Sequence, residues 1–230
     1  MFKTIFQEQY DYFGSLIIKG EFGNKVVNNL ASLIGNVGFN ILKLEEVTDL
    51  SDNVITFVIA DNLTEAEWVK IRSATSSTIF VIGCASPVQE PQANSCFICE
   101  TSPELCIQTL ISMMKLIGGD GLVMTDFADI RHVLIECGQQ NHVIYIESTH
   151  PEEAIERVLK QLSNKPIALD QVKGILLNMV IGEDFEFSNI PPIIEGVAAD
   201  VSETTSVIFG TTFDVNKQGQ ELGLNMIVSY

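Results

Sequence analysis

The sequence has few basic residues and no long hydrophobic run. Lys and Arg total 13 against 30 Asp and Glu, so the formal net charge is −17 at pH 7. A chain of that charge repels phosphate backbones and anionic lipids, and we expect no nucleic-acid partner. The longest apolar runs, 79–85 and 174–182, are far shorter than a membrane span, and the N-terminus lacks a signal-peptide pattern. We expect a cytoplasmic protein with no membrane insertion.

Cysteine is sparse, and its number is odd. An odd count in a chain of this size argues against a secreted disulfide framework; the five are Cys84, Cys96, Cys99, Cys106 and Cys137. Cys96 and Cys99 form a C-x-x-C, but no second pair follows to complete a zinc site. The Phe-Ile between them is typical of a strand. We therefore expect no metal site, and we interpret His132, His142 and His150 as surface or packing residues.

Hydrophobic residues make up 46% of the chain, which supports a large core and excludes a disordered protein. In the first 85 residues, short apolar segments predict strands at 15–20, 39–44, 54–60 and 79–84, with helical spacing between them. Thr64 and Glu67 form a capping-box pattern that predicts a helix start. The strands are apolar on both faces, so we expect a doubly wound α/β sheet covered on both sides by helices.

The second half has a different pattern. Helices are expected at 103–117, 126–137, 151–162 and 191–199, and strands at 96–100, 143–147, 174–180, 206–213 and 223–229. We predict an N-terminal α/β lobe at 1–102, a connecting central helix at 103–120 and a smaller α+β lobe at 121–230.

Ligands of doubly wound sheets bind at the carboxyl ends of the strands, so the loops there are candidate sites. Gly20, Gly23 and Asn24 open a helix after the first strand, where a phosphate would be favoured. However, Glu21 and Phe22 lie between the glycines and would repel and obstruct a phosphate, so a structural turn is the alternative. The loop after the third strand, 60–65, has no glycine and two carboxylates.

Asp126 and Asp129 lie three residues apart at a predicted helix start. One interpretation is a helix cap with an acid in the first turn. The other is a pair of carboxylates presented at a surface, able to position water or a cation. The sequence leaves both open.

Residues 121–131, GLVMTDFADIR, resemble the G-L-I-N-x-D-F-A-D-V-R stretch of the bacterial tubulin homologue FtsZ. Segments 17–28, 174–184 and 207–211 also resemble FtsZ segments in the same order, and their spacing implies deletions in the first half. The resemblance implies a tubulin/FtsZ-like fold in which the D-F-A-D loop of one subunit completes the nucleotide site of the next. Asp126 and Asp129 match the acids of that loop, and Met124 stands where the family has Asn. By this resemblance the partner-binding residues are Met124, Thr125, Asp126, Phe127 and Asp129.

The glycine-rich signature of FtsZ, G-G-G-T-G-T-G, is replaced here by 61–67, DNLTEAE. That signature works because glycine backbone N–H groups approach the phosphates closely. With no glycine and three acids, we expect degenerate nucleotide-binding loops, no GTP or GDP as cofactor and no GTPase activity. Gly20, Gly23 and Asn24 would be a remnant of the nucleotide site, and Asp126 and Asp129 a remnant of the catalytic loop.

Three functions remain open. The first is a non-hydrolysing FtsZ-like protein that joins or modulates cell-division filaments, through head-to-tail contacts with FtsZ or with itself. The second is a GTPase-like protein that binds a nucleotide in an altered site. The third is a scaffold for an unrelated partner, with Asp126 and Asp129 as plain helix caps.

Overall fold

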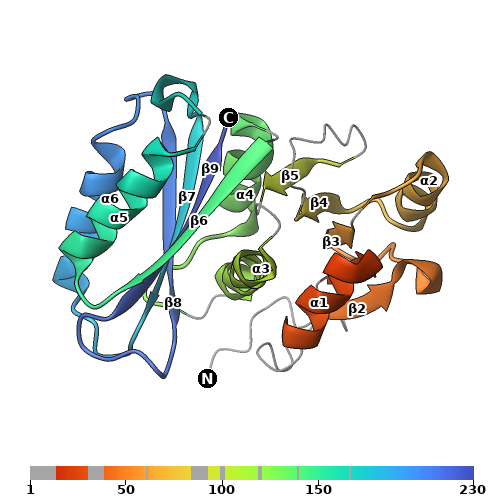
Figure 1. Cartoon of the computed structure of the whole chain (residues 1–230), viewed down its shortest axis with the longest axis horizontal. Helices are drawn as coiled ribbons and strands as arrows, with labels where there is room; N and C mark the ends of the chain where they lie inside the picture. Colours follow the sequence, from red (N-terminus) through yellow and green to blue (C-terminus); the bar gives the residue numbers. More distant parts are fainter. Residues whose placement is uncertain are drawn as a thin grey trace. The chain divides into compact units, whose positions relative to one another are not determined.

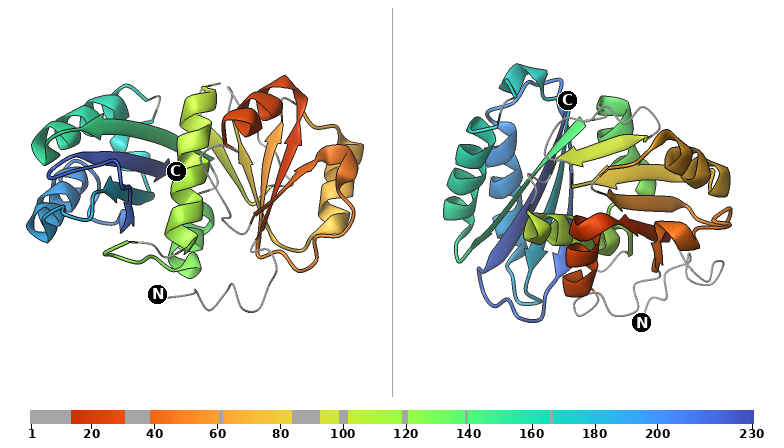
Figure 2. Two further views of the ribbon diagram at one scale, coloured as in Figure 1. Left: turned by 90° about the horizontal axis from the view of Figure 1, so that it is seen from below. Right: turned by 45° about the vertical axis from the view of Figure 1, so that its right-hand side comes forward.

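The computed structural model describes residues 14–30, 39–60, 62–83, 93–98, 102–118, 121–138, 140–165 and 167–230. The chain forms two compact units, Met1–Ile107 and Gln108–Tyr230 (Figures 1 and 2). The division falls within helix α3, Pro103–Gly118, which the sequence predicted as a central helix. The second unit includes most of this helix together with the predicted C-terminal lobe.

The first unit contains a parallel sheet, as its uniformly apolar strands predicted. The strands lie in the order β2-β1-β3-β4-β5, and every paired strand is parallel to its neighbour. Their bounds are β1 Gly14–Lys19, β2 Phe39–Lys43, β3 Ile55–Ala60, β4 Thr78–Ile82 and β5 Ser95–Ile98. Because the strands are parallel, their carboxyl ends meet at one edge, which we call the carboxyl edge.

Helices cover both faces of this sheet. Ile17, Val58 and Val81 pack with α2, Glu65–Ala74, in one core cluster that also includes residues beside the 3-10 helix η2, Leu44–Glu46. Their neighbours along the strands point to the opposite face, where α1, Gly20–Leu30, contacts β1 and β3 (Figure 2). The doubly wound arrangement is therefore confirmed.

The second unit contains a mixed sheet in the order β6-β9-β7-β8. β9 is antiparallel to β6 and β7, and β8 is parallel to β7. The bounds are β6 Gln140–Ser148, β7 Gly174–Ile181, β8 Ser206–Phe213 and β9 Leu222–Ser229, with 3-10 helices η4 Leu169–Gln171 and η5 Phe187–Asn189. Helices α5, Pro151–Ser163, and α6, Ile190–Ala198, cover one face (Figure 1). On the other face Asn178 Nδ2 donates to Ser112 Oγ of α3 at 2.8 Å.

One predicted helix changes its character partway along. Residues 126–137 were expected to form a single helix, but only α4, Phe127–Arg131, is α-helical. It continues as the π-helix η3, His132–Cys137, which contacts β7 and β8. None of the helices that the structure describes is long and apolar enough to span a bilayer.

Candidate functional site

At the carboxyl edge of the first unit, no loop separates β1 from α1. β1 ends at Lys19, and α1 begins at the next residue, Gly20, whose φ of 81° suits a glycine. Asn24 Nδ2 donates to the Gly20 carbonyl oxygen at 2.7 Å. The sequence predicted a glycine turn before this helix, but the helix begins at once, so residues 20–24 form its first turn.

Gly23 has a packing role. A Cβ there would lie 2.9 Å from the carbonyl oxygen of Ile59 and 3.3 Å from Cβ of Ile18. The absence of a side chain therefore lets α1 approach β1 and β3 closely. The packing of this helix accounts for the glycine without any ligand.

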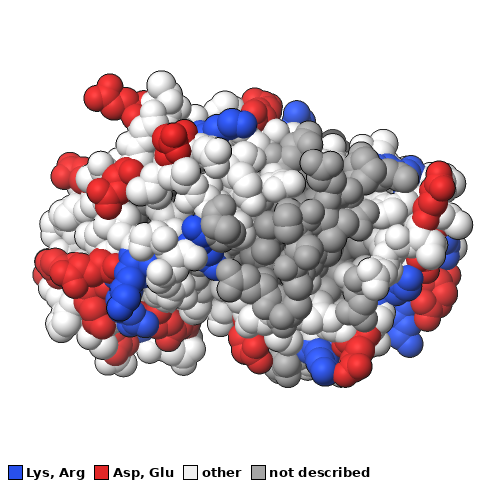
Figure 3. All heavy atoms as spheres, turned by 45° about the horizontal axis from the view of Figure 1, so that its top comes forward, with Lys and Arg blue, Asp and Glu red and all other residues white. Residues whose placement is uncertain are grey.

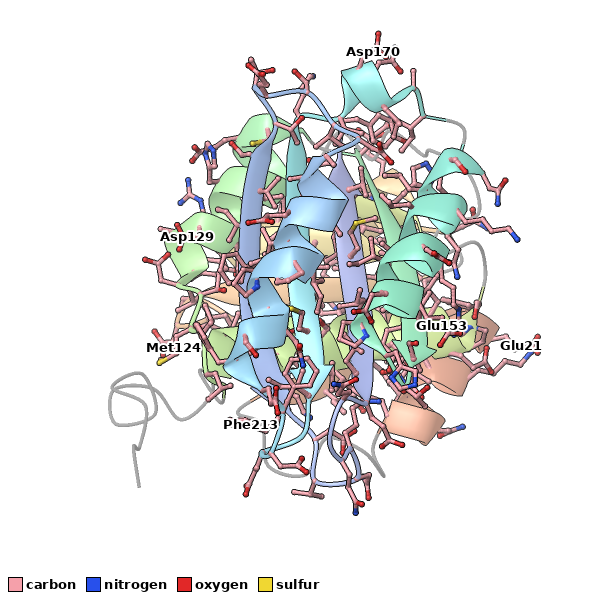
Figure 4. All side chains as sticks on the ribbon, turned by 90° about the vertical axis from the view of Figure 1, so that its left-hand side faces the viewer. Glu21, Met124, Asp129, Glu153, Asp170 and Phe213 are labelled. Atoms are coloured by element: carbon pink, nitrogen blue, oxygen red, sulfur yellow. The ribbon has the colours of Figure 1, made fainter. Side chains whose placement is uncertain are left out.

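Phe22 and Glu21 take opposite positions on this first turn. Phe22 is half-buried, and its ring lies against Gly83, just beyond β4, where a Cβ would overlap it. Glu21 is exposed and pairs with Lys25 at 2.8 Å, and this hydrogen bond holds the pKa of Glu21 below its usual value. Figure 4 shows Glu21 projecting outward from its helix. Phe22 therefore occupies space at the carboxyl edge, whereas the Glu21 side chain projects outward.

The start of α2 is occupied by a side chain of the same helix. Thr64 and Glu67 form the predicted capping box: Glu67 N donates to Thr64 Oγ1 at 3.3 Å, and Thr64 N donates to Glu67 Oε2 at 2.8 Å. Lys19 Nζ donates to the same Oε2 at 2.8 Å and to the Asn62 carbonyl oxygen at 2.7 Å. The hydrogen bonds from Lys19 and then from Thr64 lower the pKa of Glu67 to about 2.

The start of α2 already holds a carboxylate of this chain. The Glu67 carboxylate lies at the helix N-terminus, where an anion would be favoured, and it already holds Lys19. A phosphate brought to the same place would meet that carboxylate, and residues 62–67 offer no glycine for close approach. The role of Lys19 was not predicted from sequence, because its bond to Glu67 joins residues 48 apart in the chain.

The segment 121–126 of the second unit lies along the edge strand β8. Thr211 N donates to the Val123 carbonyl oxygen at 3.0 Å, and Val123 N donates to Thr211 Oγ1 at 2.9 Å. Thr125 is buried, and its Oγ1 donates to the Phe209 carbonyl oxygen at 3.1 Å. These contacts hold the segment in place.

The side chains that alternate with these anchors along the segment are exposed. Leu122 is 47% exposed and Met124 68% exposed. Asp126 caps α4, because its Oδ1 accepts from Asp129 N at 2.7 Å. Both acids are exposed, and Figure 4 shows Met124 and Asp129 on the same side of this unit. The capping interpretation is confirmed, and the same geometry presents both carboxylates at the surface beside an exposed methionine.

A cavity of about 470 Å³ lies elsewhere in the second unit. It is lined by Glu147, Ser148, Thr149, Glu153, Arg157, Asp214, Asn216, Lys217 and Glu221. Two ion pairs lie in this lining: Arg157 Nη1 is 3.5 Å from Glu153 Oε1, and Lys217 Nζ is 3.5 Å from Glu147 Oε1. Four acids line the cavity against two bases, so its lining is net acidic.

On the face drawn in Figure 3, acidic side chains are scattered with Lys and Arg among them, and the drawn charges form no continuous basic patch. Across the described part of the chain, no three His, Cys, Asp or Glu side chains are placed to hold a metal ion.

No family model matches the chain. Among curated proteins it resembles cell division protein FtsZ of Coxiella burnetii, with 29% identity over 116 residues, which is 50% of this chain and 30% of that protein. FtsZ 1 of Methanocaldococcus jannaschii is 24% identical over 120 residues, 51% of this chain and 32% of that protein. The mitochondrial division protein fszA of Dictyostelium discoideum is 29% identical over 103 residues, 44% and 20% of the two chains. The matches thus span a third or less of these relatives.

Solved structures resemble the chain over nearly its whole length. An empty FtsZ dimer of M. jannaschii has a TM-score of 0.78 at 13% identity and covers 98% of this chain and 90% of its own. GDP-bound CetZ1 of Haloferax volcanii has a TM-score of 0.63 at 9% identity and covers 94% of this chain and 93% of its own. TubZ of Bacillus thuringiensis, in GDP-form protofilaments, has a TM-score of 0.61 at 8% identity and covers 95% of this chain and 86% of its own. The tubulin/FtsZ-like fold is confirmed, and the chain is a divergent FtsZ-like protein, similar to FtsZ in sequence over about half its length.

Proposed function

We propose that this is a non-hydrolysing FtsZ-like protein that joins or modulates cell-division filaments through protein–protein contacts. The observation that carries the proposal is the Glu67 carboxylate, bonded to Lys19 at the N-terminus of α2. The Glu67 carboxylate lies where a nucleotide phosphate would need to lie. It is already paired with Lys19, the positive charge that a phosphate would need. Phe22, packed against Gly83, adds a steric obstacle at the same edge.

The contact surface is the outward side of the D-F-A-D segment. Met124, Asp126 and Asp129 are exposed there, while Thr125 anchors the segment to β8. Solved relatives include an FtsZ dimer and TubZ protofilaments, which supports self-assembly or addition to a filament as the mode of action. Head-to-tail assembly uses two different faces of each subunit, so a subunit with one competent face adds to an end and blocks further growth.

The test mixes this protein with purified FtsZ and GTP and follows light scattering and GTP turnover. Wild type changes both in proportion to its concentration. Asp126→Asn with Asp129→Asn loses most of this effect, because two surface charges are removed while Asn still caps the helix about as well as Asp. The matched control, Glu152→Gln with Glu156→Gln on exposed positions of α5, makes the same charge change elsewhere and keeps the effect.

Two results contradict the proposal. One is a wild-type protein that alters neither FtsZ scattering nor turnover and also sediments as a monomer by itself. The other is a double Asn variant with undiminished effect. Either result favours a scaffold for an unrelated partner, in which Asp126 and Asp129 are caps only.

A further inference from the structure

The π-helix η3 brings together a cysteine, a histidine and a glutamate. In an α-helix, residues five apart lie about 140° from each other around the axis, so Cys137 would point away from His132. In a π-helix the backbone hydrogen bond joins residues five apart, which places them one turn from each other. Cys137 Sγ accordingly lies 3.6 Å from His132 Nε2.

Glu136 orients the imidazole. Its Oε2 lies 3.0 Å from His132 Nδ1, which favours the tautomer with the proton on Nδ1. The lone pair of Nε2 then faces Cys137 Sγ and also Ser206 Oγ, which lies 3.2 Å from it. The arrangement is therefore the one that activates a nucleophile: the thiol lies beside the base, and the carboxylate orients the base.

The sulfur has room and access to solvent. A Cβ on Gly174, at the start of β7, would lie 2.9 Å from Cβ of Cys137 and 3.3 Å from its Sγ, so the glycine makes space for the thiol. Cys137 is only half-buried, and the His132 side chain is 46% exposed.

We propose that Cys137, His132 and Glu136 form a reactive-thiol site whose substrate class is small hydroperoxides. As Cys137 Sγ attacks the terminal oxygen, its proton passes to His132 Nε2. The O–O bond breaks, and the departing oxygen takes that proton. The products are a cysteine sulfenic acid and an alcohol, or water from hydrogen peroxide; the sulfur loses the two electrons that the peroxide gains. A hydroperoxide suits this site because it needs only a nucleophilic sulfur and a proton for the leaving oxygen.

The experiment treats the folded full chain with hydrogen peroxide at pH 7, traps sulfenic acid with dimedone and reads each cysteine peptide by mass spectrometry. Cys137 is labelled. The buried Cys106 serves as an internal reference and remains unlabelled. His132→Ala lowers the Cys137 rate about tenfold or more, since general acid–base catalysis contributes at least that much. His150→Ala removes an exposed histidine elsewhere in the same unit, keeps the rate and is the matched control.

Imidazole in the buffer separates chemistry from structure. A base lost from a half-exposed position is replaced by free imidazole, so the Cys137 rate of His132→Ala recovers with imidazole concentration, whereas a folding defect does not. Glu136→Gln lowers the rate less than His132→Ala and provides a second reading if the alanine variant unfolds. The proposal is overturned if Cys137 reacts no faster in the folded protein than in concentrated urea, or if neither variant slows it.

Discussion

Glu67 accepts hydrogen bonds from Lys19 and from Thr64, and these hold its pKa at about 2. The pKa in the unfolded chain is near the ordinary 4.5. Because the folded value is the lower one, ionised Glu67 stabilises the fold above pH 4.5. That contribution is lost as pH falls from 4.5 toward 2.

Glu67→Gln removes the charge and should lower the free energy of unfolding at pH 7. The difference in stability between wild type and variant is measured from denaturant midpoints by circular dichroism. This difference should narrow steadily below pH 4.5, because wild-type Glu67 then gains a proton on unfolding. Glu65→Gln, an exposed change in the same helical turn, is the control and should show no such narrowing. A gap of the same size at pH 7 and at pH 3 would argue against the pairing.

The capping box of Thr64 and Glu67 was predictable because its residues are three apart and local spacing defines the motif. The bond from Lys19 was not, since it joins residues 48 apart in sequence. Only the parallel pairing of β1 with β3 puts the end of one strand beside the helix that follows the other.

Among the elements, the segment 121–126 depends on a close approach to β8. A Cβ on Gly210 would lie 2.7 Å from Cδ2 of Leu116 and would overlap Thr125 Oγ1. Gly210 therefore sets how near the D-F-A-D segment comes to the strand, and so where its exposed acids stand.

Gly210→Ala should displace this segment, cost about 1–3 kcal/mol of stability and abolish the effect on FtsZ assembly although Asp126 and Asp129 are unchanged. The control is Gly223→Ala in β9, where a Cβ would lie 3.0 Å from the flexible end of Tyr145. That variant should also lose stability but retain the FtsZ effect in light scattering. Full activity of the Gly210 variant would show that placement of the segment is irrelevant.

The π-helix was not predictable, although its position in a helix was. Ile130, Val133, Leu134 and Cys137 follow α-helical spacing and predicted one regular helix. Local sequence carries no clear signal for an i to i+5 bond, and η3 contacts β7 and β8. The sequence therefore did not predict that His132 would contact Cys137.

For the whole molecule, the nucleotide question has a thermodynamic test. A ligand at about 100 times its Kd stabilises a protein by about 2.7 kcal/mol, which raises the Tm of a chain of this size by roughly 5–10 °C. GTP or GDP with Mg²⁺ should leave the Tm of this protein unchanged, with an active FtsZ as positive control. A clear rise, together with heat in calorimetric titration, would support the altered-nucleotide-site alternative instead.

Composition and periodicity alone determined the alternation of strands and helices, the parallel α/β class, the helix caps and the lack of glycine after β3, because each is a property of neighbouring residues. Tertiary structure alone decided that Lys19 bonds Glu67 and that Thr125 anchors to Phe209, pairs 48 and 84 residues apart. Such contacts follow from strand order, which local patterns do not encode. They determine which charges meet at the carboxyl edge and which side of the D-F-A-D segment faces solvent.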